Sequence, residues 1–133
     1  MLIEELEDTA AFRAPNGECG WARAQIPDVV ATLREHRLAI LGGELWWIRE
    51  DSRGWEGMIP QCDGLPAVYH WESERMSGES WLSYVERCAR ETLAAVADLP
   101  RPGEVPPELP GQILYNLTWV DEAEVGELGS RAV

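Results

Sequence analysis

The sequence predicts an α+β fold, with a mostly antiparallel sheet of four to five strands and two helices packed on one of its faces. Apolar residues recur at helical spacing in two segments and alternate with polar residues in several shorter ones. Three strand-like runs follow one another closely between residues 38 and 74, which predicts an antiparallel meander at the centre of the sheet. The 133 residues suffice for one core, so we expect residues 1–133 to form a single α+β domain.

The first third of the chain predicts one strand and one helix. Residues 2–13 carry only a weak pattern that fits a short strand or a frayed helix, and we favour the strand. Pro27 suits the first turn of a helix, where its missing N–H is not needed. Val29, Val30 and Leu33 then form an apolar stripe, so we expect a first helix at about residues 27–37.

The segment LAILGGELWWIRE, residues 38–50, is apolar at both sets of alternate positions. This pattern predicts a central strand covered at least in part on both faces. Residues 55–61 predict a second strand, and the Asp63-Gly64 dipeptide favours a tight hairpin after it. Residues 65–74 alternate cleanly between apolar and polar side chains and complete the predicted meander.

The second half of the chain contains the most regular pattern. In residues 78–98, apolar side chains recur every three or four residues, which predicts a second helix. Ser77 is its predicted N-cap. Residues 99–111 hold five of the nine prolines and predict an extended connector across the surface. Residues 112–120 alternate as a further strand, and Asp121 starts a short helical turn ending near Gly129.

The charge balance narrows the classes of partner. The sequence contains twenty-four acidic and eleven basic residues, which gives a net charge of −13. Every basic residue is an arginine. An acidic surface repels nucleic acid, so we expect no nucleic-acid binding and a basic protein as any macromolecular partner. The absence of lysine excludes Schiff-base and P-loop lysine chemistry.

Cysteine usage and the N-terminus favour a cytoplasmic setting without membrane association. The three cysteines are odd in number and far apart, which fits neither a disulfide framework nor a zinc site. The first ten residues are acidic, unlike a signal peptide. The longest apolar run, residues 38–48, is too short for a membrane span.

Glu44 lies between a pair of glycines and a pair of tryptophans, and this position raises the question of a pocket. Alternation places Glu44 on one face with Ile40, Trp46 and Ile48, and the bare glycines leave room for a ligand or another backbone. A β-bulge at the glycines is the alternative, because it would flip the register and turn Glu44 outward.

Aromatic and polar side chains supply the other candidates. Trp46 and Trp47 must point to opposite faces of their strand, so one faces the helices and the other faces solvent, a partner, a pocket or the proline-rich connector. His70 and Glu72 share one strand face, although no fourth ligand for a metal is identifiable and no cofactor is expected. The candidate binding residues are Glu44, Trp46, Trp47, Trp55, His70 and Glu72.

These observations favour a small acidic binding module over an enzyme. We expect an immunity-type, antitoxin-type or accessory protein that docks a basic protein partner. A small-molecule binder or minor enzyme, with a tryptophan-lined pocket and Glu44 as its polar anchor, is the alternative. A homodimer through Trp47 or Trp55 is a third hypothesis, and no residue is assigned a catalytic role.

Overall fold

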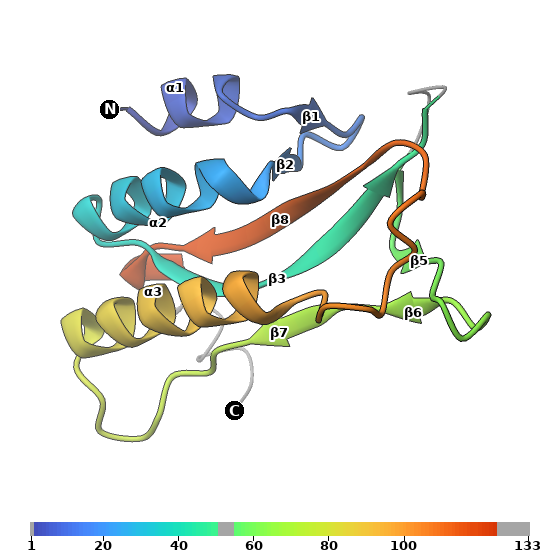
Figure 1. The fold of residues 1–133 in the computed structure, drawn as a ribbon. Helices are drawn as coiled ribbons and strands as arrows, with labels where there is room; N and C mark the ends of the chain where they lie inside the picture. Colours follow the sequence, from blue (N-terminus) through green and yellow to red (C-terminus); the bar gives the residue numbers. More distant parts are fainter. Residues whose placement is uncertain (1, 51–54, 125–133) are drawn as a thin grey trace.

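The computed structural model describes residues 2–50 and 55–124, and it confirms the α+β class (Figure 1). The main sheet has the strand order β1-β2-β8-β3-β4, with β7 also paired to β3, and all these pairs are antiparallel. The helices are α1 (Ile3–Asp8), α2 (Ile26–Glu35) and α3 (Trp81–Asp98), with a 3-10 turn at Arg23–Gln25. The strands are β1 (Phe12–Arg13), β2 (Cys19–Trp21), β3 (Ala39–Ile48), β4 (Trp55–Glu56), β5 (Met58–Ile59), β6 (Ala67–Val68), β7 (His70–Glu72) and β8 (Gln112–Val120).

Helices α2 and α3 lie side by side on one face of the sheet, as predicted (Figure 1). Their buried stripes, represented by Leu33 on α2 and Cys88 on α3, join one core with Leu45 of β3 and Tyr115 of β8. Burying each large apolar side chain of such a core stabilises the fold by about 1.5–3 kcal/mol. None of the described helices combines the length and apolar character that a membrane crossing requires.

The start of the chain differs from its predicted strand. Residues Ile3–Asp8 form helix α1, and only Phe12–Arg13 pair as a strand. Ile3 and Leu6 are three residues apart and both pack on the core, which is the spacing of one helix face. Glu4 and Glu5 lie in the first turn, where negative charge favours the helix dipole. The apolar pattern was too short to distinguish the two structures.

Residues 38–74 form antiparallel strands as predicted, but the middle strand is short and divided into β4 and β5. Strand β4 pairs with the end of β3, and β5 pairs with β6. Pro60 lacks the N–H that a longer ladder needs, so the middle strand ends there. Strand β7 therefore pairs directly with β3 at Gly42–Glu44. The Asp63-Gly64 dipeptide lies within a longer loop between β5 and β6, with Gly64 at φ +93°.

The proline-rich residues 99–111 contain no helix or strand and run along the end of the helix layer toward β8 (Figure 1). The carbonyl of Pro110 accepts a hydrogen bond from the Trp47 indole at 2.8 Å. Beyond β8, the Asp121 carboxylate accepts a hydrogen bond from the Glu124 N–H at 2.8 Å, as expected at a helix start. The predicted end of that turn near Gly129 lies outside the described residues.

Helix α3 begins one turn later than predicted, because Ser80 rather than Ser77 is its N-cap. The Ser80 hydroxyl accepts a hydrogen bond from the Ser83 N–H at 3.2 Å. The loop before the helix is held by Arg87, whose guanidinium contacts Glu79 at 2.8 Å and Glu91 at 2.7 Å. This network fastens the connection between β7 and α3.

We expect the Arg87 network to make stability depend on pH in the acid range. Hydrogen bonds from Arg87 lower the pKa of Glu79 from 4.5 to about 2. A lowered pKa means that the stabilisation is complete above the unfolded value and is lost as pH falls toward 2. Urea unfolding from neutral pH to pH 2 should therefore show a steeper acid loss for the wild type than for Glu79→Gln.

The matched control for this experiment is Glu86→Gln, because Glu86 is exposed and approaches Arg34 only at 3.7 Å. Its pH dependence should remain close to that of the wild type. Equal acid slopes for the wild type and Glu79→Gln would contradict the assignment.

Candidate binding face

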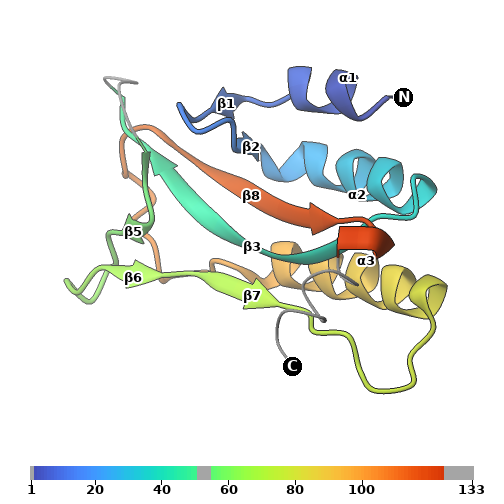
Figure 2. The ribbon, with the colours of Figure 1, turned by 180° about the vertical axis from the view of Figure 1, so that it is seen from behind.

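Strands β7, β3 and β8 present a second face, opposite α2 and α3, that no described helix covers at its centre (Figure 2). Register places His70, Glu44 and Asn116 side by side across the three strands. Thr118 and Glu72 flank Gly42 in the neighbouring row. Directly opposed residues have Cβ atoms about 4.5–5.5 Å apart, so these polar groups form one continuous patch. We call this patch the open face.

A β-bulge between Ile40 and Gly42 determines which side chains reach the open face. Ile40 belongs to the core beneath the helices, whereas Trp46 and Ile48 belong to a second cluster on the opposite side of the sheet. Glu44 therefore shares its face with Trp46 and Ile48 but not with Ile40. The alternation hypothesis is right in placing Glu44 on the same face as Trp46. The β-bulge hypothesis is right in that the register changes at the glycines.

The glycines of β3 permit close approach of β7. A Cβ on Gly43 would lie 2.6 Å from the Trp71 ring and 2.3 Å from the Asn116 carbonyl oxygen. The Trp71 indole N–H donates to the Thr92 hydroxyl of α3 at 3.3 Å. This arrangement fastens β7 to both the sheet and the helix layer, so the polar side chains on the open face have a rigid support.

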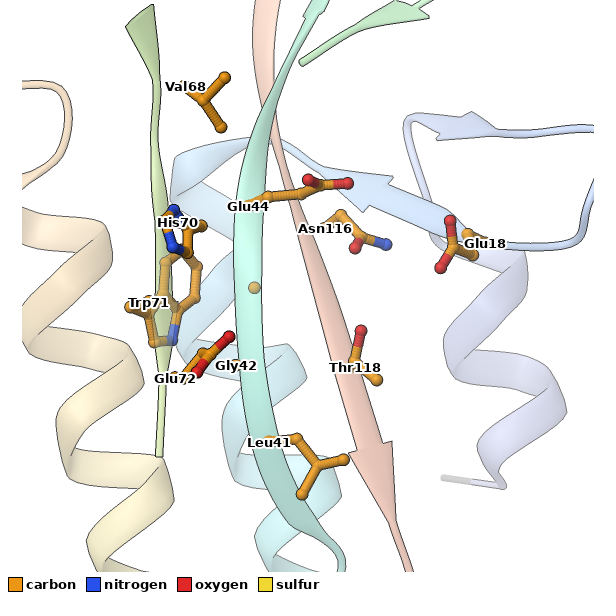
Figure 3. Close-up of a pocket in the computed structure, with 11 residues that line it drawn as sticks. Glu18, Leu41, Gly42, Glu44, Val68, His70, Trp71, Glu72, Asn116 and Thr118 are labelled. Atoms are coloured by element: carbon orange, nitrogen blue, oxygen red, sulfur yellow. The ribbon is translucent and has the colours of Figure 1, made fainter. Parts of the chain in front are cut away.

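Glu44 is half-buried and has one fixed oxygen. Its Oε1 accepts a hydrogen bond from the Trp46 indole N–H at 2.8 Å, and no described residue bonds to the other oxygen. Trp46 itself is fully buried against Phe12 and Trp55, with ring centroids 6.3 and 5.7 Å away. The carboxylate is thus oriented from one side and available from the other (Figure 3).

A hollow of about 520 Å³ lies over the open face. Figure 3 shows the Glu44 carboxylate directed toward Asn116 and Glu18, with His70 and Trp71 on the β7 side. Apart from the glycines, its lining residues are Glu18, Leu41, Glu44, Val68, His70, Trp71, Glu72, Asn116 and Thr118. Among the described residues, three carboxylates and no arginine therefore line this hollow.

The carboxylates around the hollow lack arginine partners, as do many of the other described carboxylates, but here three of them gather around one hollow. Among the described residues, Glu18, Glu44 and Glu72 form no ion pair. Glu18 accepts a hydrogen bond from the Asn16 amide, which leaves its charge uncompensated. The paired arginines lie outside the lining and are Arg13, Arg34, Arg49, Arg87 and Arg101. The hollow is consequently suited to a cation.

The three cysteine thiols, the other reactive groups considered, do not line the hollow. Burial raises the pKa of the Cys88 thiol to about 11 and also raises that of Cys19. Both thiols are protonated at neutral pH, so neither is a nucleophile. Cys62 is exposed but does not line the hollow. Within the described part of the chain, no three metal-ligating side chains of His, Cys, Asp or Glu come together.

The structure brings together only some of the candidate residues. Glu44, His70 and Glu72 line the hollow, and Trp46 supports Glu44 from beneath. Trp47 lies on the helix side under the proline-rich connector, and Trp55 packs on Trp46. Neither Trp46 nor Trp47 lines the hollow beside Glu44, whereas Trp71 does, with its indole N–H bonded to Thr92 on the helix side.

Three further polar residues of the lining, Glu18, Asn116 and Thr118, were not among the candidates from the sequence. Asn116 and Thr118 occupy the polar positions of β8, and a buried asparagine in an otherwise apolar strand was the available signal. The Asn116 amide donates to the Cys19 carbonyl at 2.9 Å, which holds β2 beside β8. Glu18 precedes β2 and had no distinguishing pattern.

The fold and the site together define an α+β protein with one acidic sheet face that the described helices leave uncovered at its centre. Comparison with protein-family models, curated proteins and solved structures found no match to this chain. Functional inference therefore rests on the geometry and charge of the open face.

Proposed function

We propose that this protein is a non-catalytic binding module that docks a basic protein partner on its open face. The supporting observation is the set of carboxylates from Glu18, Glu44 and Glu72, which lack arginine partners among the described residues. An arginine side chain from a partner would supply the missing charge, and its planar fork matches a carboxylate in two hydrogen bonds. An immunity-type or antitoxin-type inhibitor of a basic protein is the class that this surface suits.

The neighbourhood of the carboxylates supports a protein partner. Val68 borders the hollow and is 55% exposed, and Met58 is its directly opposed partner across the β5-β6 pair. Apolar contacts of this kind accommodate the aliphatic stem of an arginine or an apolar residue next to it. Free thiols at Cys19, Cys62 and Cys88 suit a reducing compartment, and we place the interaction in the cytoplasm.

Neutralising two carboxylates should weaken binding of an arginine-rich peptide. The probe is a fluorescently labelled synthetic peptide, titrated by anisotropy against wild type and Glu44→Gln/Glu72→Gln. We expect at least about tenfold weaker binding by the variant, which corresponds to about 1.4 kcal/mol. The amide oxygen that Glu44→Gln introduces can still accept the Trp46 hydrogen bond, so the fold should be retained.

The matched control is Glu4→Gln/Glu5→Gln, which removes the same charge from helix α1, away from the open face. This control should retain most of the affinity. All affinities should fall at about 1 M salt, where the Debye length is about 3 Å. Equal weakening by the two double variants would show attraction to net charge alone and would refute the proposed site.

A further inference from the structure

Within the part of the chain that the structure describes, strand β7 has a hydrogen-bonded neighbour on one side only. Among the described residues it pairs with β3 and with no other strand. The Tyr69 carbonyl accepts from the Leu45 N–H, and the Ser73 N–H donates to the Leu41 carbonyl. Because successive residues of a strand direct their backbone groups to opposite sides, His70 and Glu72 direct theirs away from β3. No described group bonds to those outward N–H and C=O groups.

The side chains along this edge form an ordered sequence of exposed groups. Val68, His70 and Glu72 alternate onto the open face, and the exposed Glu74 follows two residues later. Glu72 and Glu74 form no ion pair among the described residues. The edge therefore runs from an apolar position to two carboxylates without ion pairs, spaced about 7 Å apart in an extended chain. The Arg87 guanidinium donates a hydrogen bond to the Glu74 carbonyl at the far end of this edge.

From this edge we infer that the basic partner contributes an extended segment that adds to β7 as a further antiparallel strand. The inference rests on the proposed function and specifies how the partner binds. An added strand has the same repeat as β7, so two arginines or lysines at alternate positions would lie beside Glu74 and Glu72. An apolar residue four positions after the second basic one would lie beside Val68. The antiparallel direction follows the other pairs of this sheet.

Charge complementarity selects a basic segment as the occupant. Among the described residues, the other edge strands of the main sheet, β1 and β4, are two residues long, and neither borders the hollow. Backbone hydrogen bonds to His70 and Glu72 would supply affinity, and the alternate side chains would supply specificity. The same geometry explains how a partner reaches the open face without displacing any described element.

Backbone methylation of a peptide separates strand addition from charge attraction. The parent probe is a synthetic peptide with arginines designed to face Glu74 and Glu72 and an isoleucine designed to face Val68. One derivative carries N-methyl groups on the residues opposite His70 and Glu72, and its matched control carries them on the intervening residues. The first should bind at least about tenfold more weakly than the parent, and the second should bind like the parent.

The outcomes distinguish the inference from the proposed function. Equal affinities for both methylated peptides, whether retained or lost, would overturn strand addition. If Glu72→Gln/Glu74→Gln still weakened the parent peptide in that case, docking of a basic partner on this face would stand. Absence of parent binding would overturn both. A dimer of the protein alone that His70→Pro converts to a monomer would assign the edge to a second copy and also overturn the inference.

Discussion

Replacing Trp46 by alanine is expected to destabilise the protein by about 3–5 kcal/mol, the usual cost of emptying a large aromatic site in a core. Trp46 is fully buried, and its ring packs on Phe12, Trp55 and the bare backbone of Gly20. The other buried members of this cluster are Ala14, Ile48 and Leu114, which are all smaller than Trp46, so closing the cavity would require a strand to move. Equilibrium unfolding in urea measures the loss directly.

The control variant Trp46→Phe separates the packing contribution of the Trp46 ring from the contribution of its N–H hydrogen bond to Glu44. Phenylalanine retains much of the apolar volume but cannot donate to Glu44, whose Oε1 would lose its 2.8 Å hydrogen bond. We expect this variant to be clearly more stable than Trp46→Ala and to bind the arginine peptide with altered affinity, because the carboxylate is no longer oriented. An alanine variant as stable as the phenylalanine variant would contradict the packing argument.

The parts of the fold that sequence predicted are those governed by local spacing. Helix α3 follows directly from its apolar stripe, and β8 follows from alternation between Leu114 and Trp119. Helix α1 was missed because six residues supply too few periods to distinguish a helix from a strand. The length of the middle meander strand depended on Pro60, whose effect on a ladder is visible only with the pairing partner known.

The candidate site was predictable only where it lies within one strand. His70 and Glu72 share a face by alternation alone, and the structure places both on the hollow. Asn116 comes to Glu44 through the β3-β8 pair, which joins segments more than sixty residues apart. No local pattern encodes that register, and the bulge at Gly42 shifts it further. Alternation likewise separates Trp46 from Trp47 but does not say which face of the strand is covered, so it could not place either ring relative to the hollow.

Gly42→Ala should cost about 3 kcal/mol or more, because the added methyl group meets backbone and not a movable side chain. Its Cβ would lie 2.1 Å from the Trp71 carbonyl oxygen and 3.1 Å from the Glu72 Cα. Relief of this clash requires β7 to move away from β3, which would disrupt the row of His70 and Glu44 and weaken peptide binding as well as stability.

The matched control is Gly57→Ala, since nothing lies within 4 Å of a Cβ there, and it should change neither stability nor peptide binding substantially. Urea unfolding and peptide anisotropy on both variants check this, and a Gly42→Ala protein with wild-type stability would refute the close pairing of β7 with β3 on which the open face depends.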